Sequence, residues 1–421
     1  MNRKIDVQEL RKGMYVYELD RPWVGTPFLF QGFEIRTDEE LSTLRSLCQY
    51  VYITDDPGKP MAPHTRPLAS ATPSTIITGD TGYADVLPRL IPHRAPARYR
   101  DQVSLDQEMG SARILESTTR ELIYTIMDDV RLGRSLDIQR TRYAIGGMVE
   151  SVVRNPDALV WLTQLKNKDE YTALHSLRVC ILALTFGRHL GLSEEDLELL
   201  GTGALLHDIG KLRVPNDILN KPARLTDREY EIMKSHVPLG VQILDNTRGI
   251  PAAAVTVAHS HHERYGGTGY INGITGEKIG LFGLIGAVVD SYDAITSDRS
   301  YHAGLSAYDA LARLYDARGT DFHPALVEQF IQCMGIYPIG SIVELNTGSV
   351  GVVITVNRER RLRPKVAVVL DENKKPHAVV PVIDLYGAGA ETSGMIPEIR
   401  RVLPSGAYNI NANNYLPTVA V

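Results

Sequence analysis

Apolar residues recur at helical spacing through the long middle part of the chain, from about residue 106 to residue 334. Leu122, Ile126 and Val130 lie four positions apart, and a similar apolar stripe leads up to Asp290. This spacing is typical of helices with one buried face. Four prolines stand where such helices should begin or end, namely Pro215, Pro222, Pro238 and Pro251. The middle of the chain is therefore predicted to be a helical bundle.

The N-terminal part shows a different pattern, in which short β-like runs alternate with turn residues. The runs are residues 14–17, 28–30 and 50–53, and Thr37 is a suitable N-cap for a helix from Asp38 to Cys48. We expect a small α+β module over residues 1–56. Residues 57–105 are rich in proline, serine and threonine without sustained periodicity, which indicates a linker.

Beyond Pro338 the pattern changes to paired strands, with Gly348, Asn357 and Asp371 at the turns. Residues after about 386 give weak signals and stay unassigned. The expected strands cover residues 341–345, 351–355 and 366–370. The predicted fold class is mainly α, with a helical domain over 106–335 between the N-terminal module and a small C-terminal β extension over 336–421.

Composition narrows the class of protein. The formal net charge of −5 gives no reason to expect binding to duplex nucleic acid. The three cysteines, Cys48, Cys180 and Cys333, are isolated, so they encode neither a disulfide framework nor a CxxC zinc site. The N-terminus lacks an apolar signal region, and the longest apolar run, near residues 281–289, is too short to span a bilayer. We expect a soluble cytoplasmic protein that does not bind membranes, and the sequence leaves its oligomeric state open.

Histidines carry the main chemical signal. Seven of the twelve fall between His175 and His262, together with a His207–Asp208 doublet and an acidic Asp290 further on. Neutral imidazole and carboxylate together suit divalent iron, manganese or zinc. Ligands from several separate segments indicate more than one metal, because a mononuclear site needs only three or four side chains. A multinuclear hydrolytic centre is the hypothesis that follows.

The doublet shows how such a centre could be built. On a continuous helix His207 and Lys211 share a face, and Asp208 could bridge two metals only at a helix end or kink, for which Gly210 is a suitable irregularity. Lys211 would then point its charge at an anionic ligand. The alternative is a capping aspartate beside a surface histidine.

The other histidines differ in how strongly their sequence context indicates a metal ligand. His175 alone would more often be a core residue than a ligand, and His236 lies just before Pro238 at an expected helix boundary. We interpret His189, at an expected helix C-terminus, and His259 as structural.

Two further segments add candidate side chains. In the run from His261 onward, two adjacent imidazoles point in different directions, and a glycine-rich loop could bring Tyr270 near the cleft. Asp290 and Asp293 share a helix face, which suits one ligand and one hydrogen-bonded partner that orients it. Arg299 could hold a phosphate or a guanine edge, or could pair with Asp293 at the helix end.

The segments HSLRV, HDIGK, MKSH, HHERYGGTGY and DSYDAITSDRSY occur in this order between about residues 169 and 335. In this they resemble the HD-GYP family of metal-dependent cyclic di-GMP phosphodiesterases, and the N-terminal module resembles the uncharacterised domain that often precedes it. The resemblance implies a helical HD-type bundle. It implies substrate contacts at Lys211, Tyr270, Arg299 and His302. The metal ligands that it implies are His175, His207, Asp208, His236, His261, His262 and Asp290.

The chain departs from the family pattern at several positions. Ile271 replaces the proline of the naming triad, Gly266 replaces a common aspartate, and His302 stands where a basic residue is frequent. Tyr171 stands where some members have a glutamate that supports a third metal, so we infer two metals. Ile271 should leave the loop freer than proline would.

The resemblance implies two-metal hydrolysis of cyclic di-GMP to pGpG, or to GMP. Asp208 would bridge the ions, and Lys211 would neutralise charge on the phosphoryl oxygens. Iron or manganese is expected, with zinc, nickel and cobalt as further candidates. The alternatives are a catalytically weak cyclic di-GMP receptor and a broader nucleotide phosphohydrolase. GGDEF-domain proteins are candidate partners of the loop around Tyr270.

Overall fold

The structure is a computed structural model. The chain divides into two compact units, residues 1–84 and residues 85–421. Within the described part of the chain, no helix is both long and apolar enough to cross a bilayer. The residues that the structure describes are 3–21, 26, 28, 30, 32–54, 99–164, 171–297, 304–357, 362–386 and 397–415.

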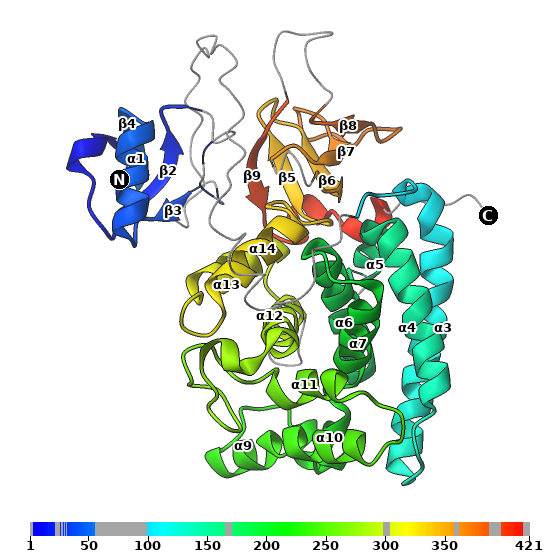
Figure 1. The fold of residues 1–421 in the computed structure, drawn as a ribbon. Coiled ribbons are helices and arrows are strands. Elements are labelled where there is room, and N and C mark those ends of the chain that lie inside the picture. Colours follow the sequence, from blue (N-terminus) through cyan, green and yellow to red (C-terminus); the bar gives the residue numbers. More distant parts are fainter. Residues whose placement is uncertain are drawn as a thin grey trace. The chain divides into compact units, whose positions relative to one another are not determined.

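The N-terminal unit is a small antiparallel sheet with one helix, labelled in Figure 1. Thr37 caps the helix as predicted, and its hydroxyl accepts from the backbone N–H of Glu40 in a capping box. The strands follow the order β1-β4-β2-β3. The bounds are β1 (Arg3–Asp6), β2 (Tyr15–Leu19), β3 (Phe33–Glu34), α1 (Asp38–Leu47) and β4 (Tyr50–Thr54).

One predicted strand of this unit is wrong. Phe28 and Phe30 lie outside any strand, and β3 forms at Phe33–Glu34 instead. The ring of Phe28 packs 4.8 Å from that of Phe33, and Phe30 is buried. These apolar side chains therefore pack on the core of the module. From the sequence alone, a short apolar run that packs in this way cannot be distinguished from a strand.

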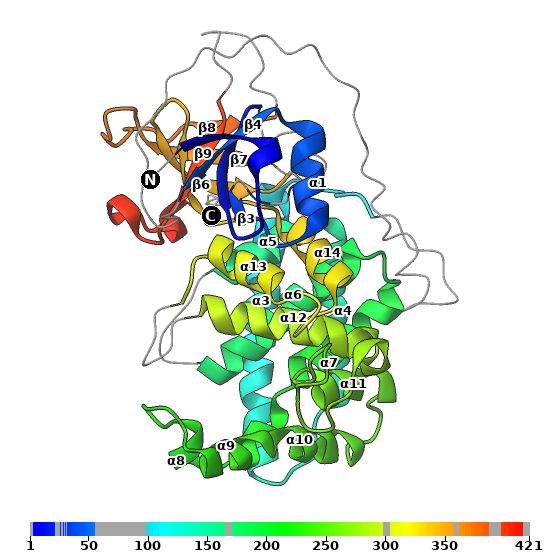
Figure 2. The same cartoon turned by 90° about the vertical axis from the view of Figure 1, so that its left-hand side faces the viewer.

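The middle of the chain is helical, as predicted. Helices α3 and α4 run side by side (Figure 1), and α12 packs against α6, α11 and α14 (Figures 1 and 2). The helices are α3 (Leu105–Arg131), α4 (Ile138–Arg154), α5 (Pro156–Leu162), α6 (Tyr171–His189), α7 (Glu194–Leu206), α8 (Asn216–Leu219), α9 (Asp227–Lys234), α10 (His236–Asp245), α11 (Ala252–Ser260), α12 (Leu281–Thr296), α13 (Ala307–Asp316) and α14 (Pro324–Met334), with a 3-10 turn η3 (Ile209–Arg213) after α7.

Local sequence explains where several of these helices begin. Ser104 and Gln107 form a capping box at the start of α3, and Ser193 and Thr226 cap α7 and α9 through their hydroxyl groups. Helix α12 is apolar on most sides because it is enclosed by other helices, and its carboxylates Asp290 and Asp293 are buried too. Carboxylates buried in this way must be paired, so they mark the region where the centre forms.

The C-terminal strands form an antiparallel sheet in the order β8-β7-β6-β5-β9. Trp161 of α5 donates its indole N–H to the Ile354 carbonyl at 2.8 Å, which joins the helical part to this sheet. The three predicted strands are confirmed as β5 to β7, and the predicted fold class is confirmed. The bounds are β5 (Ile342–Leu345), β6 (Val350–Thr355), β7 (Lys365–Leu370), β8 (Val382–Asp384) and β9 (Ile399–Leu403).

Candidate metal centre

The seven predicted metal ligands lie on five separate elements that converge at one point. Asp208 is at the convergence, in the turn between α7 and η3. Helix α7 ends at Leu206, so the helix end that a bridging Asp208 requires is present. The contributing elements are α6 with His175, the end of α7 with His207 and Asp208, α10 with His236, the end of α11 with His261 and His262, and α12 with Asp290.

Gly210 permits the closest approach in this region. A Cβ atom at this position would lie 1.9 Å from the backbone oxygen of His236 and 2.5 Å from the backbone nitrogen of Gly240. No side chain fits such a space, so glycine lets α10 pack directly on the turn after Asp208. The glycine therefore brings His236 close to Asp208.

The two oxygens of Asp208 face different groups of imidazoles. Oδ2 lies 3.5 Å from Nε2 of His175 and 3.3 Å from Nε2 of His207. Oδ1 lies 3.4 Å from Nε2 of His236 and 3.7 Å from Nε2 of His261. A carboxylate with one oxygen toward each group has the geometry of a bridging ligand between two cations.

The same division appears when possible ligand atoms are grouped by distance. Ligand atoms of His175, His207 and Asp208 lie within 4.8 Å of one another, and so do those of Asp208, His236, His261 and His262. Asp290 extends the first group, because its Oδ1 lies 3.1 Å from Nε2 of His175 and 3.9 Å from Nε2 of His207. All seven predicted ligands are therefore brought together. We name these the His175 half and the His236 half of the centre.

Polar atoms without hydrogen-bond partners point into the centre. Among the described residues, Nε2 of His207, His236 and His261 and Oδ1 of Asp208 are buried and make no hydrogen bond. An unpartnered buried polar atom is costly, and four of them at one point need a common partner. Divalent cations would satisfy all of them, so the residues present fit a metal centre.

Hydrogen bonds on the far side of the rings fix which nitrogen faces the centre. Nδ1 of His207 lies 2.8 Å from the Ala204 carbonyl, and Nδ1 of His236 lies 2.6 Å from the Met233 carbonyl. His261 makes the same kind of contact with a backbone carbonyl of its own helix. A carbonyl accepts only from a protonated Nδ1, so Nε2 is left as the metal-binding lone pair.

His175 is held differently, by buried charged groups. Its Nδ1 lies 2.8 Å from Oδ2 of Asp293, which confirms that Asp293 neighbours a candidate ligand. Arg178 donates to both oxygens of Asp293, at 2.7 and 3.0 Å, and also lies within hydrogen-bond distance of Ser297. Sequence reasoning missed Arg178, although it follows His175 by three positions and therefore lies on the same face of α6.

Burial and charge set the protonation of these groups. Burial lowers the pKa of His236 to about 4 and also lowers the pKa of His261. For His175 burial acts in the same direction, but Asp290 and Asp293 outweigh it and raise the pKa to about 9. Burial opposes ionisation of Asp208, yet Lys211 and His207 hold its pKa well below the usual range. The bridging position therefore stays a carboxylate.

Lys211 does not share a helix face with His207, because α7 ends before it and Lys211 belongs to η3. The helix end that the sequence left open as an alternative to a continuous helix is the arrangement observed, and it places Lys211 after the end of α7. Its ammonium group instead contacts Oδ2 of Asp208 at 2.5 Å. Contact of Lys211 with a phosphate stays a prediction.

The loop that follows His262 is held by a buried carboxylate. Glu263 is fully buried and accepts from the backbone N–H groups of Asn272 and Ile274, at 2.8 and 3.0 Å. Gly269 is required for close approach, since a Cβ there would lie 2.5 Å from the His262 carbonyl oxygen. The sequence alone does not identify the role of Glu263, and it indicates the glycine-rich loop only as a means of bringing Tyr270 near the cleft.

Tyr270 lies beside the centre, and its contact with the substrate stays a prediction. Its ring stacks on that of His262 with centroids 4.6 Å apart and planes at 28°. Burial raises the pKa of Tyr270, so its hydroxyl stays protonated. Two other predicted substrate contacts, Arg299 and His302, lie outside the described residues, as does the side chain of Tyr171.

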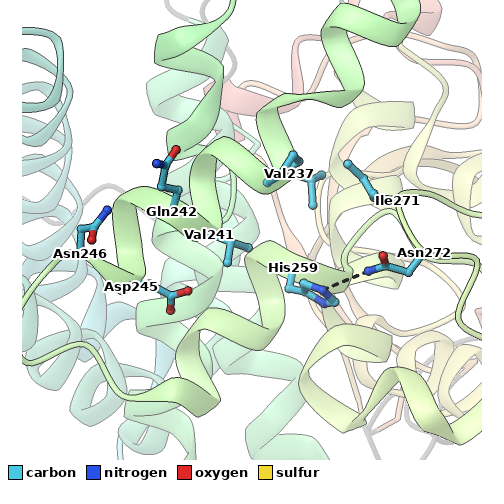
Figure 3. A pocket seen from close by; sticks show the side chains of 9 residues that line it. Val237, Val241, Gln242, Asp245, Asn246, His259, Ile271 and Asn272 are labelled. Carbon is cyan, nitrogen blue, oxygen red and sulfur yellow. Dashed lines mark hydrogen bonds between the residues drawn. The ribbon is translucent and has the colours of Figure 1, made fainter.

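A pocket of about 520 Å³ lies beside this loop, along one face of α10. Figure 3 shows His259 of α11 on its wall, hydrogen-bonded to Asn272 at 3.2 Å. His189 contacts the side chain of Gln329 at 3.1 Å. Neither histidine belongs to the groups of possible ligands, in line with the structural roles expected for them.

Comparisons with known proteins agree with this geometry. Residues 157–326 match the HD domain family, residues 2–141 match a domain of unknown function, DUF3391, and residues 342–388 match a KOW domain associated with HD domains. A cyclic di-GMP phosphodiesterase of Pseudomonas aeruginosa is 36% identical over 392 residues, which cover 92% of this chain and 90% of the relative. The chain belongs to the HD-GYP family of cyclic di-GMP phosphodiesterases.

Other relatives match a smaller share of the chain. A cyclic di-GMP phosphodiesterase response regulator of Xanthomonas campestris is 36% identical over 202 residues, 47% of this chain and 53% of the relative. A 3'3'-cGAMP-specific phosphodiesterase of Vibrio cholerae is 34% identical over 162 residues, 38% of this chain and 31% of the relative. A solved HD-GYP-type protein of Bdellovibrio bacteriovorus is 15% identical, with a TM-score of 0.45 over 78% of this chain and 98% of that one.

Proposed function

We propose that this chain is a metal-dependent phosphodiesterase that hydrolyses cyclic di-GMP to pGpG, and further to GMP where it accepts the linear dinucleotide. The observation that carries the proposal is the position of Asp208, with one oxygen toward each group of buried imidazoles. The similarity to the Pseudomonas aeruginosa enzyme over nearly the whole chain supports the choice of substrate.

The proposed centre would hold two divalent cations, with Asp208 as the ligand common to both. Iron or manganese fits a set of imidazoles and carboxylates, and zinc, nickel and cobalt are further candidates. The proposed ligands of one cation are His175, His207 and Asp290, and those of the other are His236, His261 and His262. When bound, the cations would supply Lewis acidity toward the phosphoryl oxygens and a nucleophilic water for in-line attack.

The protein's own groups would then position and balance the charge of the substrate. Asp208 is already a carboxylate, so it can act as a bridge without losing a proton. Lys211 holds an ammonium group beside it, where phosphoryl oxygens would gain negative charge during the reaction. Tyr270 keeps its hydroxyl proton at neutral pH and can therefore donate a hydrogen bond to the substrate.

A second candidate substrate is 3'3'-cGAMP, because relatives from Vibrio cholerae are named as phosphodiesterases specific for it. The two cyclic dinucleotides differ in one base, and the geometry around Asp208 does not read the base. A receptor without turnover is disfavoured because the set of candidate ligands is complete. GGDEF-domain partners, the oligomeric state and a cytoplasmic location stay predictions.

The test is product chromatography with metal-loaded protein and each cyclic dinucleotide. We expect pGpG from cyclic di-GMP, with its formation lost in His207→Ala. His189→Ala is the matched control, because His189 contacts Gln329 and belongs to neither group of possible metal ligands. Failure of the metal-loaded wild-type protein to cleave cyclic di-GMP would refute the proposed substrate. A fully active His207→Ala variant would refute the proposed centre.

A further inference from the structure

Within the described part of the chain, the candidate centre meets solvent at His262, which is partly buried, and at Asp290, whose side chain is 11% exposed. Asp208, His236 and His261 are buried, whereas His262 is only partly buried. Tyr270 covers His262 by stacking on its ring. His262 and Tyr270 therefore lie on an open side of the described centre, and side chains beside Tyr270 line this entrance.

An aromatic side chain of α9 lies beside Tyr270. The ring centroid of Tyr230 is 6.1 Å from that of Tyr270, and the two planes are nearly perpendicular, at 81°. Tyr230 is 46% exposed, which is high for a tyrosine in an aromatic cluster. The ring of Tyr270 contacts both that of Tyr230 and that of His262, so a planar group could rest on Tyr230 while remaining attached to a phosphate at the centre.

Positive charge accompanies these rings. Lys234 follows Tyr230 by one helical turn, and its Nζ lies 5.2 Å from the Tyr230 centroid and 5.8 Å from the Tyr270 centroid. Lys234 also pairs with Glu231 at 2.6 Å, which keeps the ammonium group near the entrance. Aromatic rings beside a lysine are the combination that holds a nucleotide, because every base has a π face and every nucleotide a negative charge.

We propose that Tyr230, together with Tyr270 and Lys234, forms a nucleobase subsite at the entrance to the metal centre. It holds a purine base of the nucleotide whose phosphate lies at Asp208. The subsite rests on the proposed function for the identity of the substrate, but it makes a claim about binding that can be tested without turnover. Stacking is expected to be the main interaction, so the ring of Tyr230 matters and its hydroxyl does not.

The test is calorimetric titration of the full metal-loaded chain with GMP and with ribose 5-phosphate, which lacks the base. In Tyr230→Ala the affinity for GMP should fall about tenfold, the lower part of the range known for a base stacked on an aromatic side chain. Tyr230→Phe should bind GMP as the wild type does. Affinity for ribose 5-phosphate should be the same in all variants.

Tyr143 provides the matched control. It lies on α4 and is 87% exposed, so Tyr143→Ala removes an exposed tyrosine of a helix that contributes no candidate ligand. We expect Tyr143→Ala to bind both ligands as the wild type does, and the melting temperatures of both alanine variants to be unchanged. Wild-type affinity of Tyr230→Ala for GMP would overturn the subsite. An equal loss for ribose 5-phosphate would also overturn it, because it would show that Tyr230 supports the centre itself.

Kinetics separate this proposal from the proposed function. With cyclic di-GMP, Tyr230→Ala should raise KM about tenfold and leave kcat nearly unchanged. If the wild type fails to hydrolyse cyclic di-GMP but Tyr230→Ala loses GMP affinity, the subsite stands and the proposed substrate is wrong. If cyclic di-GMP is hydrolysed but the variant binds GMP normally, the function stands and the subsite is wrong.

Discussion

The two halves of the candidate centre are built from the same kind of ligand but are held in different ways. In the His175 half, the imidazole of His175 lies between the carboxylates of Asp290 and Asp293, and Arg178 locks Asp293 in place. In the His236 half, backbone carbonyls hold the imidazoles of His236 and His261, and among the described residues the carboxylate within 4 Å of these two imidazoles is that of Asp208.

This difference predicts unequal metal sites. Carboxylates around His175 add negative charge, which favours a cation there, whereas the His236 half offers neutral imidazoles and the shared Asp208. A carboxylate behind an imidazole also makes that ligand more basic. We therefore expect the His175 half to hold its cation more tightly, and the His236 half, which meets solvent at His262, to lose its cation first.

The largest effect is expected where the two halves meet. Asp208→Ala removes the side chain that both groups share, and with it the proposed bridge between the two cations. Activity should fall more than about 100-fold and both cations should be lost. Even the loss of a residue that only hydrogen-bonds to a metal ligand lowers metal affinity or activity by about 10–100-fold. Elemental analysis and turnover measure this, with exposed Asp217→Ala as control. Retention of two cations in Asp208→Ala would contradict the bridge.

The next effect concerns the charged support of the His175 half. Arg178→Lys keeps the charge but loses the forked contact with Asp293, so cation affinity in this half should fall about tenfold. The other half should bind as before. A cobalt titration followed by visible absorption would resolve the two binding steps.

The chain contains a matched control for this variant. Arg154 donates to both oxygens of buried Glu108, at 2.8 Å each, and Ser151 completes a similar cluster away from the centre. Arg154→Lys should lower the free energy of unfolding about as much as Arg178→Lys, by about 1–3 kcal/mol, and leave both metal steps unchanged. Equal weakening of both steps in Arg178→Lys would show a general loss of structure.

A smaller effect is expected at the loop beside the His236 half. Glu263→Gln keeps the shape of the side chain but leaves one backbone N–H, of Asn272 or Ile274, without a good acceptor. The loop should then hold Tyr270 less firmly, and KM should rise several-fold while the metal content stays constant. The exposed Glu277 of the same loop provides the control, Glu277→Gln. A loss of metal in Glu263→Gln would mean that Glu263 supports the ligands directly.

The smallest effect is a difference in protons released when each cation binds. The pKa of His175 is raised to about 9, so at pH 7 it carries a proton that a cation must displace, and affinity should rise as the pH approaches 9. The pKa of His236 is lowered to about 4, so it is already neutral at pH 7 and releases no proton. Titrations in two buffers of different ionisation enthalpy measure this. Equal proton release from both halves would contradict the assigned protonation states.

The sequence contained the ligands but only part of their support. His207 and Asp208 could be identified from the doublet, and Gly210 indicated an irregularity next to it. In the structure Gly210 is the position at which α10 approaches the backbone. Arg178 and Glu263 could not be assigned, because their partners Asp293 and Asn272 are fixed by packing between helices and by the path of a loop. Helical periodicity predicted the bundle well, whereas short apolar runs such as residues 28–30 do not separate core packing from strand pairing.

The central claim is that Asp208 bridges two cations. Anomalous diffraction from crystals of the manganese- or iron-loaded protein tests it directly. The account predicts two anomalous peaks on opposite sides of Asp208, one beside His175, His207 and Asp290 and the other beside His236, His261 and His262. A single peak, or a pair of peaks not bridged by Asp208, would contradict it.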